Sequence, residues 1–256
     1  EKKGCVLVKR FSCLLLALVL CGSLTSPAFA VNTSQSNPPV LISSETSTFN
    51  GIETLVEHYV QNGATITAYT FLDKSISKAE ANTTIDSIKL SSSTSPAIMA
   101  SASDVPTPIA TRYFNESDQH PTTVRGVASH HGTFCKSNID YAYLWVKNGH
   151  SEIAFNDPEY TPEITVKRTF TTTGLSVGVS WPPSVTTTNS SYSCADVGPI
   201  SANFLTVDWP NVYCVTKKAG TAFSLTAITD ASMYVKGESR VYSSHVETTQ
   251  KFQSGW

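Results

Sequence analysis

The clearest alternation of side chains in this sequence lies in the segment Asn138–Lys147, which reads NIDYAYLWVK. Successive side chains of an extended strand point to opposite faces of the sheet. Apart from Asp140, both sets of alternate positions here are apolar through Val146, so both faces of the strand would be covered. We therefore expect this segment to be the central strand of a β-rich domain in the second half of the chain.

The rest of the chain after Thr122 follows the same two-residue period in short runs, which Gly, Pro and Asn interrupt. The dipeptide Asn148-Gly149 is a strong hairpin signal between two of these runs. About seven to nine such runs predict an antiparallel β-sandwich or open barrel over residues 122–256. The expected strands are Thr123–Phe134, Ile139–Lys147, Ser151–Phe155, Glu163–Thr173, Leu175–Trp181, Phe204–Trp209, Val212–Thr216, Ala222–Thr229 and Ser232–Val246.

Residues 51–61 show a helical period instead. Asn50 would cap a helix over these residues, and Asn62-Gly63 would end it in a left-handed conformation. The apolar positions have the spacing of one helical face. They are Ile52, Leu55, Val56, Tyr59 and Val60.

This helix is expected to begin a small helix–strand–helix segment over residues 50–90. The run Ala64–Leu72 is rich in Thr and aromatic residues, which favours a strand. Ser77 and Glu80 have the spacing of a capping box at the start of a second helix. The apolar face of that helix would consist of Ala81, Ile85 and Ile88.

Two polar regions flank the segment. Residues 31–49 include Pro38-Pro39 and predict a flexible N-terminus. Residues 91–121 combine a run of serines with several prolines, which predicts a long connection or a domain boundary. A short strand around Ile109–Phe114 is compatible with this pattern.

The first 30 residues resemble an export signal. Basic residues precede the apolar run Leu14–Leu20, and Ala28-Phe29-Ala30 forms a small-x-small cleavage site. The apolar run has about half the length needed to span a bilayer. We therefore expect cleavage after Ala30, secretion and no permanent membrane anchor. Lipidation at Cys21 is the less favoured alternative, because the preceding residue is not small.

Charge limits the classes of partner. The whole chain has 18 basic and 20 acidic residues, and cleavage after Ala30 would leave 14 basic and 19 acidic residues. A mildly acidic protein gains nothing from counterion release on DNA or RNA, so we expect no nucleic-acid partner. The frequent aromatic residues favour a folded Ser/Thr-rich β protein over a disordered one.

Three cysteines would remain after cleavage, namely Cys135, Cys194 and Cys214. An exported protein meets oxidising conditions, so one disulfide and one free thiol is the simplest arrangement. The pair Cys194–Cys214 closes the shortest loop and is the expected bridge, with Cys135 free and buried. Three buried thiols without a bridge remain the alternative.

His130 and His131 lie close to Cys135 in the sequence and are weak candidates for a metal site. Neighbouring side chains on a strand face opposite ways, so the two histidines would need a bulge to bind one ion. The spacing HHxxxC also matches no standard zinc motif. We therefore expect no metal and no cofactor.

No recognisable catalytic motif of a hydrolase or phosphate-binding enzyme is present in the sequence. Aromatic residues at strand ends are the remaining candidates for binding, because rings there are often partly exposed. Trp181, Trp209 and Tyr192 are the expected ligand-binding residues.

These features favour a secreted, non-catalytic binding protein that acts on an extracellular envelope or host-surface ligand, such as a glycan. An extracellular hydrolase without a recognisable motif is one alternative. The other is a membrane-active, pore-forming-like protein. The segment Thr165–Ser180 resembles, in texture alone, the Ser/Thr-rich alternating segments that aerolysin-like toxins refold into a transmembrane hairpin.

Overall fold

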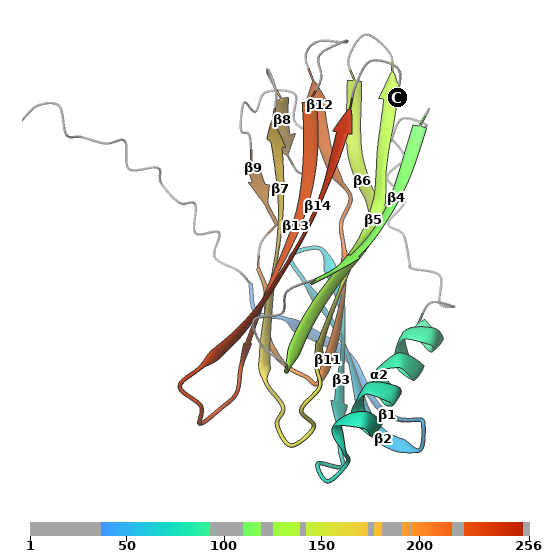
Figure 1. Ribbon diagram of the computed structural model, residues 1–256, viewed down its shortest axis with the longest axis vertical. Helices are drawn as coiled ribbons and strands as arrows, with labels where there is room; N and C mark the ends of the chain where they lie inside the picture. The colour runs from blue at the N-terminus through green and yellow to red at the C-terminus, as the bar shows by residue number, and fades with distance from the viewer. Residues whose placement is uncertain are drawn as a thin grey trace, which may run out of the picture. The chain divides into compact units, whose positions relative to one another are not determined.

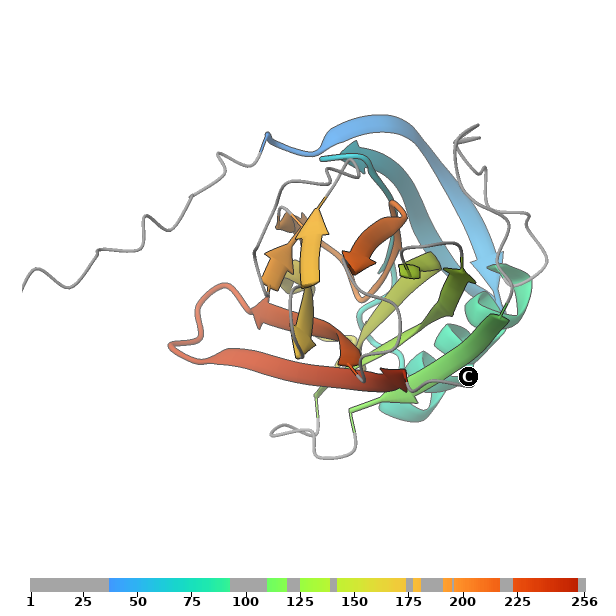
Figure 2. The ribbon, with the colours of Figure 1, turned by 90° about the horizontal axis from the view of Figure 1, so that it is seen from above.

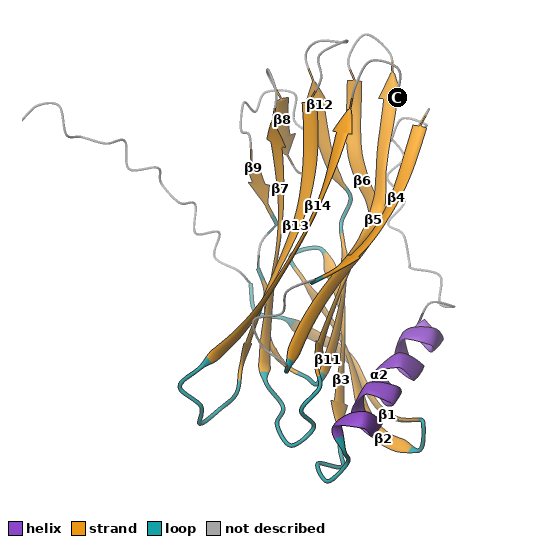
Figure 3. Cartoon of the chain, in the orientation of Figure 1, coloured by secondary structure: helices purple, strands orange, loops and turns teal. Residues whose placement is uncertain are grey.

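The computed structural model describes residues 37–92, 110–118, 125–138, 142–173, 177–180, 191–194, 196–216 and 223–252 (Figure 1). The stretch 36–256 forms one compact unit, and the expected signal peptide lies outside the described residues. Strands dominate the described chain, and its strand pairs are antiparallel (Figure 3). The expected mainly β, antiparallel class is therefore confirmed.

The larger sheet contains nine strands, and the long strand β6 lies at its centre. One edge of β6 pairs with β5, which in turn pairs with β4. The other edge pairs first with β11 and then with β12, so that β6 joins two groups of strands. This agrees with the central position expected for the segment that starts β6. The strands of this sheet are β1 (Val40–Phe49), β2 (Ile52–Gln61), β3 (Ala64–Phe71), β4 (Ala110–Ser117), β5 (Gly126–Asn138), β6 (Ala142–Phe155), β8 (Val177–Ser180), β11 (Phe204–Trp209) and β12 (Val212–Thr216).

The smaller sheet contains five strands and ends in the long hairpin β13–β14. Strand β7 pairs with β13 along its whole length, and its other edge pairs with the short strands β9 and β10. The strands of this sheet are β7 (Glu163–Thr173), β9 (Ser191–Ser193), β10 (Val197–Ser201), β13 (Phe223–Tyr234) and β14 (Val241–Phe252). The bounds expected for β7, β11 and β12 agree with the structure.

The two sheets share one apolar core. Ile66 and Ile153 come from the larger sheet and Phe170 and Met233 from the smaller one, and all four are fully or almost fully buried. A second core lies on the outer face of the larger sheet, where helix α2 (Lys78–Ser92) packs (Figure 2). Each sheet therefore buries at least one face, and the larger sheet is covered in part on both.

The expected helix over residues 51–61 is wrong, because these residues form β2. Asn50 and Gly51 both have positive φ, at 49° and 79°, and Asn62 and Gly63 repeat the pattern at 53° and 80°. Two successive residues with φ above zero form the type I′ turn that joins antiparallel strands. The Asn-Gly pairs that suggested helix ends are therefore hairpin turns, which place β2 between β1 and β3.

The second helix is confirmed together with its capping box. The Ser77 amide donates to Glu80 Oε2 at 2.7 Å, and the Glu80 amide donates to Ser77 Oγ at 3.3 Å. These reciprocal bonds satisfy two amides that the first helical turn leaves unpaired. The expected apolar face is buried against the sheet. It consists of Ala81, Ile85 and Ile88.

Several expected boundaries also change. The supposed flexible N-terminus includes the edge strand β1, and the expected connection over residues 91–121 includes β4. Asn148-Gly149 is not a hairpin turn but lies within β6, opposite a bulge in β5 between His131 and Thr133. The strands within residues 50–90, β2 and β3, belong to the same sheet as later strands, because β3 pairs with β11.

The segment Thr165–Ser180 does not form a hairpin in this structure. Its first arm, β7, belongs to the smaller sheet, whereas its second arm, β8, pairs with β12 in the larger sheet. Among the described residues, no helix has the length and apolar character needed to cross a membrane.

Candidate functional site

A surface hollow of about 620 Å³ lies where the end of β4 meets the hairpin β13–β14. Its lining comes from Glu116–Asp118, which is distant in sequence from the other two segments, and from Asp230–Ser232 and Ser243–Glu247 of the hairpin. Most of the polar groups are carboxylates and serine hydroxyls, and a single histidine, His245, stands among them. The hollow therefore offers mainly hydrogen-bond acceptors to a ligand.

His245 is held by carboxylates on both of its ring nitrogens. Asp230 lies directly opposite it on β13, and Asp230 Oδ1 is 2.6 Å from His245 Nδ1. Glu247, two residues further along β14, places Oε2 at 3.8 Å from Nε2. The hydrogen bond to Asp230 raises the pKa of His245 above its ordinary value. The histidine therefore retains its proton to a higher pH than a free imidazole.

Asp118 closes the wall of the hollow between the two sheets. Its Oδ2 accepts a hydrogen bond of 2.6 Å from the Ser244 hydroxyl, and Ser244 Oγ accepts one of 2.9 Å from the Ala128 amide. The Asp118 amide donates to the Ala128 carbonyl at 3.0 Å. This arrangement holds β14 beside β4 and β5 through side chains, and so fixes the shape of the hollow.

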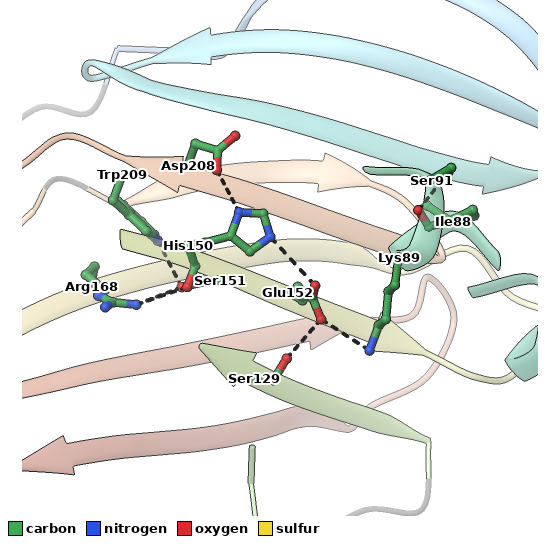
Figure 4. A network of polar contacts seen from close by, with 10 residues as sticks. All are labelled: Ile88, Lys89, Ser91, Ser129, His150, Ser151, Glu152, Arg168, Asp208 and Trp209. Carbon is green, nitrogen blue, oxygen red and sulfur yellow. Dashed lines mark hydrogen bonds and ion pairs between the residues drawn. The ribbon is translucent and has the colours of Figure 1, made fainter. Parts of the chain in front are cut away.

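The outer face of the larger sheet repeats the same combination of residues around His150 (Figure 4). His150 Nδ1 is 2.6 Å from Oδ1 of Asp208, which lies opposite on β11, and Nε2 is 3.8 Å from Oε1 of Glu152. The other oxygen of Glu152 is 3.2 Å from both Lys89 Nζ on α2 and Ser129 Oγ. One oxygen of Glu152 therefore contacts His150, and the other contacts Lys89 and Ser129. The cluster connects α2 to the sheet through Lys89.

The structure separates the histidines that the sequence suggested as metal ligands. His131 lies on the outer face of β5 and stacks on His150, with ring centroids 4.5 Å apart. His130 points into the core, where only 1% of it is exposed. Cys135 is buried and free. Within the described ranges, no three His, Cys, Asp or Glu side chains are grouped closely enough to hold a metal ion.

His130 is the end of a chain of buried hydroxyl groups that runs between the sheets. Ser151 Oγ accepts hydrogen bonds from Trp209 Nε1 at 2.9 Å and from Arg168 Nη1 at 3.1 Å, so its own proton is directed to Thr229 Oγ1. Thr229 then donates to His130 Nδ1, because Thr229 also accepts from Arg168 Nη1 at 2.9 Å.

The proton of neutral His130 therefore lies on Nε2, which is 2.8 Å from Thr248 Oγ1. Burial, and next the positive charge of Arg168, lower the pKa of His130 to about 3. His130 is thus a neutral structural residue at physiological pH and does not act as a base on a surface ligand.

Arg168, in β7, is the largest fully buried side chain of the described structure. Its guanidinium lies over the rings of Phe170 and Phe114, with its carbon 5.4 Å and 6.0 Å from the two ring centroids. Besides its bonds to hydroxyl groups, Nη1 makes a long contact of 3.4 Å to the His150 carbonyl. Sequence alternation places Arg168 on the inward face of β7, but no sequence signal marks a charge in the core.

The three aromatic residues expected to bind a ligand do not form one surface. Trp209 is buried, with 6% exposed, and its indole N–H is used by Ser151. This corrects the expectation that its ring is available at a strand end. Trp181 lies outside the described residues, and so does the side chain of Tyr192, whose backbone belongs to β9.

The expected disulfide is not formed in the structure, where Cys194 is a buried free thiol. The backbone of Cys214 belongs to β12 in the larger sheet, and its side chain lies outside the described residues. Cys194 follows β9, and its amide donates to the Arg168 carbonyl in the smaller sheet. Burial raises the pKa of Cys194 to about 12, so this thiol is protonated at neutral pH.

Sequence reasoning missed the hollow because its lining is assembled by strand register. The alternation of β14 places His245 and Glu247 on one face, but only the pairing with β13 brings Asp230 opposite His245. The comparisons give no further guidance, since no protein-family model matches the sequence and no curated protein is significantly similar to it. The hollow, with its carboxylates and hydroxyls, is therefore the candidate site that the geometry itself supports.

Proposed function

We propose that this protein is a secreted binding protein that takes up a glycan of an extracellular surface in the hollow between β4 and the β13–β14 hairpin. The observation that carries the proposal is the hollow itself. Its volume, about 620 Å³, is within the range of ligand pockets.

The polar lining fits the hydroxyl groups of a sugar. A glycan presents many O–H donors, and the carboxylates of Glu116, Asp230 and Glu247 are strong acceptors for them. The serine hydroxyls of β13 and β14 can both donate and accept.

A glycan array with the mature protein, followed by calorimetry on each bound glycan, tests the proposal. We expect Asp230→Asn to weaken binding by about tenfold or more, because a charge-assisted hydrogen bond contributes about 1.5–3 kcal/mol. Asp86→Asn is the matched control, since Asp86 is an exposed residue of α2 outside the hollow. Binding unaffected by Asp230→Asn would contradict the assignment of the hollow.

The enzyme alternative is tested on the same protein. If no glycan is retained, and the protein instead hydrolyses a compound in a general substrate panel, the binding proposal fails in favour of an extracellular hydrolase. His245, with Asp230 on its Nδ1, would then be the first group to examine, because it lines the hollow and can transfer a proton.

The membrane-active alternative has weaker support. In a transmembrane hairpin, the apolar face of β7 would have to meet lipid, and Arg168 interrupts that face between Val166 and Phe170. An arginine on a lipid-facing strand costs about 2–4 kcal/mol at the bilayer midplane. Dye release from liposomes is the direct test, and we expect intact vesicles at micromolar protein between pH 5 and 8.

A further inference from the structure

The guanidinium of Arg168 uses only one of its ends. Nη1 donates to Ser151 Oγ and Thr229 Oγ1, whereas Nε and Nη2 are buried without a hydrogen-bond partner. Nε–H and the nearer N–H of Nη2 point in the same direction along one side of the planar group. They form the two-pronged donor that binds an anion with two parallel hydrogen bonds.

No negative group compensates the charge of Arg168 within the described contacts. Its hydrogen-bond partners are hydroxyl groups and a carbonyl, and the nearby Cys194 thiol is protonated at neutral pH. Burial lowers the pKa of Arg168 only to about 10, so the guanidinium remains charged at physiological pH. A buried charge without a counter-charge is strongly unfavourable, as are two unpaired N–H groups.

Gly149 leaves room for one additional atom close to Arg168 Nη2. Gly149, in β6, has no side chain, and a Cβ placed there would lie 3.9 Å from Arg168 Nη2 and 3.5 Å from Trp209 Cβ, with no closer neighbour. The rings of Phe114 and Phe170 lie near the same guanidinium and separate it from water. The surroundings therefore suit a small, weakly hydrated, singly charged ion.

We infer that Arg168 binds a small monovalent anion of the halide class through Nε and Nη2, in a site enclosed between the two sheets. The ion accepts both N–H groups and neutralises the guanidinium. It would be taken up on folding and act as a structural component of the core. This site is separate from the surface hollow, and its test does not depend on the proposed function.

The test compares unfolding of the mature protein in sodium chloride and in sodium gluconate at equal ionic strength, with gluconate too large to enter the core. An ion that binds only the folded protein lowers the unfolding equilibrium constant about tenfold for each tenfold rise in its concentration above the dissociation constant. We expect this dependence in chloride and bromide and not in gluconate. Equal behaviour in all three salts would overturn the proposal and favour a water molecule at the site.

Two variants distinguish the site from a general salt effect. Gly149→Ala places a methyl group 3.9 Å from Nη2 without a steric clash, so it should fold and weaken the halide dependence. Arg168→Met should lose it completely, whereas Arg240→Met, which removes an exposed arginine, should retain it. Halide dependence that survives Gly149→Ala and Arg168→Met would contradict the assignment. A bromide anomalous peak beside Arg168 in crystals would locate the ion directly.

Discussion

The hydroxyl of Ser151 connects several members of the buried polar network between the sheets. Its hydroxyl accepts hydrogen bonds from Trp209 and Arg168 (Figure 4). It also donates to Thr229, so three groups depend on one oxygen. If the Ser151 hydroxyl is removed, the buried N–H groups that donate to it lose an acceptor. A buried donor left without a partner costs about 1–3 kcal/mol of stability. Hydroxyl groups that pack between two sheets in this way have a structural role.

We therefore expect Ser151→Ala to lower the free energy of unfolding by about 2 kcal/mol in urea titrations. Ser43→Ala, at an exposed position of the edge strand β1, should change it by less than about 0.5 kcal/mol. A Ser151→Ala protein as stable as the unmodified one would show that the network does not support the core.

His130 makes stability depend on pH in a defined direction. Its pKa is about 3 in the folded protein and near 6.5 when unfolded, so between these values the unfolded chain binds more protons. The stabilisation is complete above pH 6.5 and is lost as the pH falls toward 3. Burial and the neighbouring His150 also lower the pKa of His131, which acts in the same direction.

Urea midpoints measured from pH 8 to pH 4 should therefore fall steadily below pH 6.5. Each group whose pKa differs between the folded and unfolded states changes the free energy of unfolding by at most about 1.4 kcal/mol per pH unit. His130→Gln removes one titrating group and should make the decline shallower. An unchanged slope in His130→Gln would show that His130 is not responsible. His245, whose pKa is raised, opposes the trend, because its stabilisation is lost as the pH rises.

At the scale of elements, the meander β1–β2–β3 shows why local sequence signals can mislead. Asn and Gly with positive φ end helices and also form two-residue hairpin turns. The apolar residues between the two Asn-Gly pairs have helical spacing, yet Val56 and Thr54 are both buried from an extended strand. The pairing of β3 with β11 joins this meander to the larger sheet. A local sequence pattern cannot indicate a pairing between strands so far apart in the chain.

The turn Asn50-Gly51 provides a direct test of this interpretation. Nothing lies within 4 Å of a Cβ built on Gly51, so Gly51→Ala meets no steric obstacle but must adopt φ near 79°. We expect it to destabilise the protein by about 1–2 kcal/mol, whereas Asn50→Gly should be almost neutral. Equal stability of the two variants would argue against a type I′ turn here.

Elements whose signals were purely local were predicted well. Strand β7 alternates without interruption, and α2 has a cap and an apolar face within one short segment. In contrast, Asn148-Gly149 does not end β6. It lies opposite the bulge in β5 on one edge of the strand and at the change of partner from β11 to β12 on the other. These features belong to the neighbouring strands, so the sequence of β6 alone does not indicate them.

At the scale of the whole molecule, side chains rather than a backbone ladder join the free edge of the smaller sheet to the larger one. Ser244 on β14 links Asp118 and Ala128, and His130 on β5 reaches Thr248 on β14. The hollow lies at this joint, which explains why its β4 residues are more than 100 positions away from those of the β13–β14 hairpin. The sequence indicated strands and polar positions, but it contained no information on which edges meet.

The most direct test of this account is hydrogen–deuterium exchange of the mature protein with and without a glycan that it binds. We predict slower exchange in peptides that cover residues 116–118, 230–232 and 243–247, with little change in β1 and α2. Protection centred on another part of the chain, or no protection under saturating glycan, would contradict the assignment of this hollow as the ligand site.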